Sequence, residues 1–137
     1  MKPSTAGLLT AMSGFFAIPL HAATAFMTLI GTGLGSTPGD RVPDRAADLW
    51  GISLYGTPIA AVALLVLLIR WTKPVVVVYA AIWLALVGCY GAGWVIYGAS
   101  SPGPLLLPSA VPLASAGIGL YGVWSYRNSE EGSRNTR

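Results

Sequence analysis

The stretch PVVVVYAAIWLALVGCYGAGWVIYG, residues Pro74 to Gly98, decides the fold of this chain. It contains no charged side chain, and it opens a longer charge-free run that continues to Tyr126. Two further runs without Asp, Glu, Lys or Arg extend from Pro3 to Gly39 and from Leu49 to Ile69. A helix of about 20 apolar residues can cross a bilayer. Each run is therefore long enough to span a membrane.

The composition supports the same class. Of the 137 residues, 54% are hydrophobic and only 9% are charged, whereas charged residues make up about 25% of a soluble domain. The formal net charge of +3 comes from Lys and Arg residues scattered at the ends of the apolar runs. A nucleic-acid partner is not expected, because such proteins gather basic residues on one face. The sequence predicts an integral membrane protein.

We expect an all-α fold, a four-transmembrane-helix bundle that forms one domain over residues 1–137. Ser4 is a good residue to precede the first helix, Pro74 suits a first helical turn, and SSPGP at 100–104 divides the last run. The predicted helices cover about 5–30, 49–71, 74–98 and 105–126, with a polar loop at 35–48 and a polar tail at 127–137.

The first apolar run also resembles a secretory signal peptide. Lys2 precedes it, and the small residues Ala23 to Ala25 follow its first part. Because the apolar character continues as far as Ile30, we expect this segment to be retained as the first helix.

The basic residues predict the orientation in the membrane. Cytoplasmic loops carry an excess of Lys and Arg. In this chain these residues precede the first predicted helix, lie between the second and third, and follow the fourth: Lys2, Arg70, Lys73, Arg127, Arg134 and Arg137. We therefore expect both termini on the cytoplasmic side of a plasma or inner membrane.

Small residues four positions apart predict where helices approach each other. Without a hydrophobic force between helices in lipid, close packing of small side chains has to contribute to association. Gly88 with Ala92, and Ser115 with Gly119, have this spacing. These four residues are the predicted helix-packing positions.

His21, the only histidine, is the main candidate for a binding site. It lies halfway along the first predicted helix, two residues after Pro19, and ionisable residues at that depth are often functional. A neutral imidazole there can ligate a haem or a chlorophyll-like pigment, or bond a quinone carbonyl. The alternative is a hydrogen bond to a hydroxyl or carbonyl of a neighbouring helix.

Thr24 and Thr28 continue from His21 at helical spacing and form a polar stripe. Such a stripe can line a ligand or ion path, but threonine hydroxyls also bond the carbonyls of their own helix. Prolines interrupt helices at transporter sites, and this chain has Pro58 in the second predicted span and Pro108 and Pro112 in the fourth. A small oligomeric carrier or channel is therefore one possible function.

The polar loop is the natural docking site for a partner. Its acidic residues Asp40, Asp44 and Asp48 lie four positions apart, and so do its basic residues Arg41 and Arg45. The carboxylates can meet a metal only if the segment is helical, and Pro43 argues against a continuous helix. We expect Asp44 to cap a turn that leads into the second helix, and we expect no metal site.

The sequence contains no set of residues for a self-contained enzyme. No Asp or Glu lies in the predicted spans, and there is no second histidine or Gly-rich phosphate loop. We therefore expect a non-catalytic accessory subunit of a larger membrane complex, which packs against partner helices, lipid or cofactor. The expected partners are membrane lipids and other membrane protein subunits. A tetrapyrrole- or quinone-binding protein that uses His21 is the alternative.

Overall fold

A computed structural model describes residues 3–34, 43–97 and 103–134. Over these ranges the chain is helical apart from short turns, and its helices are α1 (Pro3–Leu34), α2 (Asp44–Tyr55), α3 (Thr57–Ile69), α4 (Lys73–Tyr97) and α5 (Gly103–Arg134). Among the described residues, three helical stretches are long and apolar enough to cross a membrane: Thr5–Gly31, Asp44–Ile69 and Lys73–Tyr97. The predicted membrane class is confirmed at this level.

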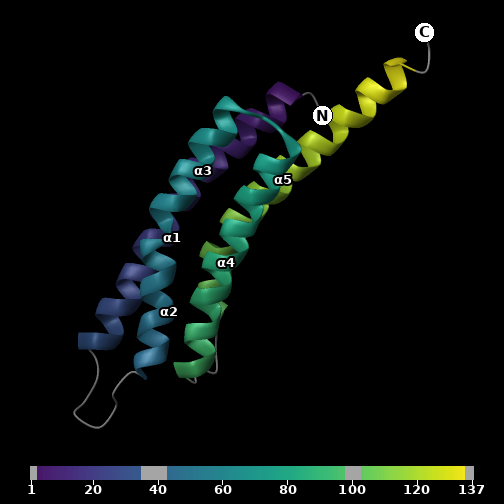
Figure 1. Ribbon diagram of the computed structural model, residues 1–137. Coiled ribbons are helices and arrows are strands. Elements are labelled where there is room, and N and C mark those ends of the chain that lie inside the picture. Colours follow the sequence, from purple (N-terminus) through teal and green to yellow (C-terminus); the bar gives the residue numbers. More distant parts are fainter. Residues whose placement is uncertain (1–2, 35–42, 98–102, 135–137) are drawn as a thin grey trace.

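The helices lie side by side along one long axis (Figure 1). Helices α2 and α3 follow each other and run opposite to α1, and α4 then runs opposite to them. The first turns of α1, the turn between α3 and α4, and the last turns of α5 lie toward the same end (Figure 1). We call this the basic end, because Arg70, Lys73 and Arg127 belong to it.

The second span begins earlier than predicted. Residues 44–48, expected in the polar loop, form the first turns of α2. Pro43 occupies the N-cap position with φ −55° and ψ 131°, and no side chain caps the helix. The predicted capping role of Asp44 is therefore wrong, although its carboxylate in the first turn still complements the helix dipole.

Pro58 interrupts the second span as expected. A proline has no N–H to offer the carbonyl four residues earlier, which here belongs to Leu54. The hydroxyl of Thr57 donates to that carbonyl oxygen over 2.7 Å, so the freed acceptor is satisfied locally. Gly56 forms the turn, and a Cβ on it would contact the side chain of Leu86. The break is thus compatible with close packing against α4.

Helix α5 continues without a break through the positions of Pro108 and Pro112. It also extends further than the predicted end at 126, and its last turns project beyond the other helices (Figure 1). The prolines in its first turns therefore do not divide it.

The buried residues of the second and third spans follow a heptad pattern. In α4 they are separated alternately by three and four positions: Val76, Tyr79, Trp83, Leu86, Tyr90 and Gly93. The same spacing runs through α2 and α3 without a phase change at Gly56: Ala46, Trp50, Ser53, Thr57, Ala60, Leu64 and Leu67. This spacing is that of left-handed coiled-coil packing, which most transmembrane bundles use.

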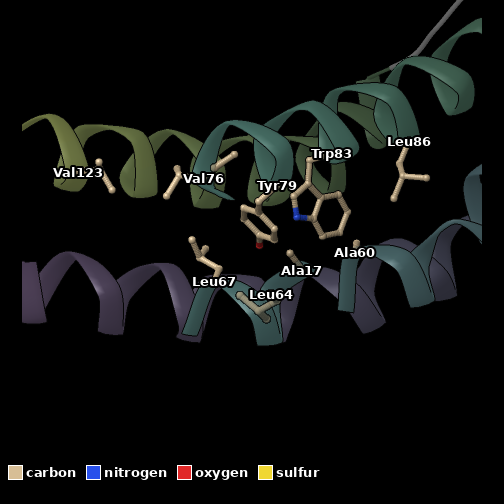
Figure 2. Close-up of a cluster of buried hydrophobic side chains, with 10 residues drawn as sticks. Ala17, Ala60, Leu64, Leu67, Val76, Tyr79, Trp83, Leu86 and Val123 are labelled. Carbon is tan, nitrogen blue, oxygen red and sulfur yellow. The ribbon is translucent and has the colours of Figure 1, made fainter. Parts of the chain in front are cut away.

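Among the described residues, two hydrophobic clusters fill the interior. In the larger one, Tyr79 and Trp83 point from α4 toward Ala17, Ala60 and Leu64 on the facing helices (Figure 2). The second cluster lies between α1, α2 and α4, and contains Ala25, Ala46, Trp50 and Tyr90. Many of the largest aliphatic and aromatic side chains face outward instead, including Phe15, which is 70% exposed. An outward apolar surface is what a lipid environment requires.

Candidate functional site

His21 is held between helices by a hydrogen-bonded serine. The imidazole is 1% exposed, and its Nε2 atom lies 2.8 Å from Oγ of Ser53 on α2. The Ser53 hydroxyl donates to the carbonyl oxygen of Leu86 on α4 over 2.9 Å. Since a hydroxyl has one hydrogen to donate, Ser53 has to accept from His21, so Nε2 carries a proton. We call this chain of two bonds the Ser53 bridge.

Aromatic rings enclose the imidazole. Trp83 and Tyr90, both on α4 and both buried, meet the His21 ring edge to face at centroid distances of 5.6 and 5.8 Å. In this arrangement Nε2 of His21 is hydrogen-bonded to Ser53, and the imidazole ring packs against the aromatic rings of α4. The histidine that the sequence singled out therefore joins α1 to α2 and α4.

The threonines of the predicted stripe differ in their partners. Thr24 donates to the Leu20 carbonyl of its own helix over 2.7 Å. Thr28 donates to the Thr24 carbonyl over 2.9 Å, and its oxygen also lies 2.7 Å from the Tyr90 hydroxyl on α4. Because the Thr28 hydrogen is already used, Tyr90 is the donor in that bond. Of the two threonines, Thr28 therefore connects α1 to α4 through its hydroxyl. A shallow depression of about 400 Å³ lies beside Thr24 and Thr28.

A second serine repeats the arrangement nearer the basic end. Tyr79 on α4 and Ser115 on α5 bring their hydroxyl oxygens within 3.1 Å. Ser115 donates to the carbonyl oxygen of Thr10 on α1 over 3.3 Å, so Tyr79 donates to Ser115. We call this the Ser115 bridge. Ser115 was predicted as a packing residue, and in the structure it joins three helices.

Both bridges use the same chemistry. A ring N–H or O–H donates to a serine oxygen, and the serine passes its own hydrogen to a backbone carbonyl. Ser53 was missed in the sequence, because its partner His21 is 32 positions away. The sequence feature that could have identified Ser53 is its position, because this hydroxyl residue lies at heptad spacing between Trp50 and Thr57.

Three buried indole N–H groups have no hydrogen-bond partner among the described residues. They belong to Trp71, Trp83 and Trp94. Trp50, in contrast, donates to the Tyr90 carbonyl over 3.3 Å. A buried donor without an acceptor costs about 1–3 kcal/mol. The packing of each ring therefore has to offset the cost of its unpaired N–H group.

The predicted packing residues separate into two groups. Gly119 is buried, and a Cβ on it would lie 3.3 Å from both Thr10 and Val76. Gly88 and Ala92 lie on the exposed face of α4, and a Cβ on Gly88 would meet nothing within 4 Å. Within the described part of the chain, this pair is therefore not covered by another helix. Other glycines at which an added Cβ would meet a neighbouring helix at close range are Gly14, Gly56, Gly93 and Gly122.

The predicted docking loop lies only partly in the structure. Asp40 and Arg41 fall outside the described residues. Asp44, Arg45 and Asp48 are exposed on the first turns of α2. No group of three or more His, Cys, Asp or Glu residues that can hold a metal occurs within the described ranges.

No family model, curated protein or solved structure matches this chain.

An apolar groove lies on the outer surface between α1 and α3. Its volume is about 800 Å³, and its walls are apolar side chains: Ala11, Met12, Phe15, Phe16, Ile18, Pro19, Ala61, Leu64, Leu65 and Leu68. Pro19 and Ala61 both contribute to its wall. We call this the α1–α3 groove.

Proposed function

We propose that this chain is a non-catalytic subunit of a larger membrane complex. In this proposal it crosses a plasma or inner membrane four times, with both termini on the cytoplasmic side. The α1–α3 groove carries the proposal, because it is a concave apolar surface on the outside of the chain. Its proposed occupant is a transmembrane helix of a partner subunit.

The shape of the groove supports a protein partner. Apolar surface gives helices no advantage over lipid in a bilayer, so association depends on close van der Waals contact. A concave surface offers more such contact than a flat one. Met12, Phe15 and Phe16 line the groove and are more than half exposed, and methionine adapts readily to the shape of a partner.

The interior supports a packing role rather than chemistry. His21, Ser53, Tyr79 and Ser115 are engaged with one another or with backbone carbonyls. Hydrogen-bonded networks of this kind hold helices together and leave those groups unavailable to a substrate. We therefore propose that His21 is a packing residue and not a cofactor ligand. The native purified protein is then expected to be colourless, and a pigment band that disappears in His21→Ala would contradict this.

Photo-crosslinking in the native membrane tests the partner directly. A benzophenone amino acid replaces Phe16 in the groove or, as the control, Leu84, which is 65% exposed on α4. We expect the position-16 probe to form one defined product with a transmembrane segment of a single companion chain, at a fixed ratio. Products with lipid alone, or the same products from both positions, would overturn the proposal.

Filling the groove provides a second test. Ala61→Phe places a ring in the groove, and Ala85→Phe adds the same ring on an exposed position of α4. The first variant is expected to lose the companion chain during gentle extraction, and the second to retain it. Unchanged thermal unfolding of both isolated variants would show that the loss reflects the interface.

A further inference from the structure

A basic groove lies between α4 and α5 at the basic end. Its volume is about 470 Å³, and it is lined by Lys73, Leu120, Val123, Trp124, Arg127 and Asn128. Lys73 is the first residue of α4, whereas the other five belong to α5. Two cationic side chains therefore reach one groove from two different helices.

The lining is graded from apolar to charged along α5. Leu120 and Val123 come first, Trp124 follows, and Arg127 and Asn128 lie one turn further toward the end of the chain. Trp124 is 60% exposed, as expected for an indole at the boundary between lipid and water. A free phosphate would make no favourable contact with the leucine and valine, whereas an amphiphile can contact both the apolar and the charged parts of the groove.

The nearby charges favour an anionic ligand. Lys73 and Arg127 are both exposed, and Arg70 lies in the turn that precedes α4. Asp44 and Asp48 are on the first turns of α2 at the opposite end of the bundle (Figure 1). Helix α5 carries Glu130 and Glu131 one turn after Arg127, but at this end the basic residues of the described helices and turns outnumber them: Arg70, Lys73, Arg127 and Arg134. Basic pockets between transmembrane helices bind the headgroups of acidic lipids.

We infer that the basic groove binds the headgroup of an anionic phospholipid. Lys73 and Arg127 contact the phosphodiester, Asn128 donates its amide hydrogens to headgroup oxygens, and Leu120, Val123 and Trp124 contact the upper part of an acyl chain. This inference does not depend on a partner subunit, because the groove is formed within one chain and shares no lining residue with the α1–α3 groove.

Native mass spectrometry of the full chain, released from detergent micelles, tests the inference. Phosphatidylglycerol and phosphatidylcholine with identical acyl chains are offered at equal concentration. We expect the anionic lipid to be retained preferentially. One basic residue near the membrane surface is expected to change binding about five-fold, so Lys73→Gln with Arg127→Gln should reduce it about 25-fold.

Matched variants separate the site from general surface charge. Arg70→Gln removes a cation at the same end but outside the groove, and is expected to retain binding. The exchange Lys73→Arg with Arg127→Lys keeps both charges and should also retain it, which shows that substitution at these positions is tolerated. Equal retention of the two lipids, or equal losses in Arg70→Gln and in the double Gln variant, would overturn the inference. Complete displacement of the lipid by inorganic phosphate would do the same, because the apolar part of the groove would then have no role.

Discussion

The contact between α1 and α5 and the contact between α2 and α4 join helices in opposite ways. At α1–α5, Gly122 lies against Ala6 and Gly119 lies against Thr10, so the two backbones approach closely. At α2–α4, Trp50 packs on Gly93 and meets Trp94 in a tilted arrangement at a centroid distance of 5.3 Å. At the α1–α5 contact, glycines let the two backbones approach each other. At the α2–α4 contact, aromatic rings fill the space between the helices. Each provides the van der Waals contact that lipid alone cannot replace.

The two contacts should therefore fail under opposite substitutions. The contact between α1 and α5 has no room for an added methyl group. The contact between α2 and α4 depends on the volume of its rings, so their removal leaves a cavity. The following variants test this difference, and each is measured as the free energy of unfolding in mixed micelles.

Trp50→Ala is expected to have the largest effect, a loss of about 3–5 kcal/mol. The ring is fully buried and contacts Trp94 and Tyr97. Far-UV circular dichroism follows unfolding without relying on tryptophan fluorescence. Trp124→Ala removes the same side chain from an exposed position and should change stability little. If both variants lose the same amount, the rings at α2–α4 are not what holds these helices together.

Gly122→Ala should come next, with a loss of up to about 3 kcal/mol. The new methyl group would collide with Cβ of Ala6, which has no flexible side chain to move away. Gly117→Ala on the same helix adds a methyl group that meets nothing within 4 Å. A Gly122→Ala variant as stable as Gly117→Ala would show that α1 and α5 are less closely packed than described.

Ser53→Ala should cost about 1–2 kcal/mol, because it leaves the buried N–H of His21 without an acceptor. The double variant Ser53→Ala with His21→Phe removes donor and acceptor together. It should lose less than the sum of the two single variants. Strict additivity in this cycle would mean that the bond between His21 and Ser53 contributes nothing to stability.

The smallest effect should separate the two threonines of the stripe. Thr28→Val loses the bond with Tyr90 and is expected to cost about 1 kcal/mol. Thr24→Val removes a hydroxyl that bonds its own helix and should remain within about 0.5 kcal/mol of the parent. Equal costs at both positions would mean that the bond to Tyr90 adds nothing to the link between α1 and α4.

The sequence predicted the membrane class and the approximate helices because length and charge determine them. The break near Pro58 was also predictable, since a missing N–H has a local consequence. The early start of α2 at Asp44 was not predictable, because a segment rich in charged residues is typical of a loop even where it forms a helix. A helix that begins in the polar boundary of a membrane can nevertheless carry them.

The inward faces were harder to predict. In water, apolar residues mark the buried side of a helix, but in lipid both sides are apolar. The buried positions of α1 include Thr10, Ala17 and His21, whereas Phe15 and Phe16 face outward. Gly88 and Ala92 have the spacing of a packing pair but lie on the exposed face of α4, because spacing does not determine how a helix is rotated about its axis.

The Ser53 bridge has a consequence for how the helices slide past each other. Moving α1 along its axis by one turn, about 5.4 Å, would bring Ala17 or Ala25 to the level of Ser53 in place of His21. Neither alanine can donate a side-chain hydrogen bond, and the imidazole would lose its acceptor. Apolar seams of similar residues tolerate such shifts, whereas one polar pair permits a single alignment. His21 and Ser53 therefore specify the register of the bundle.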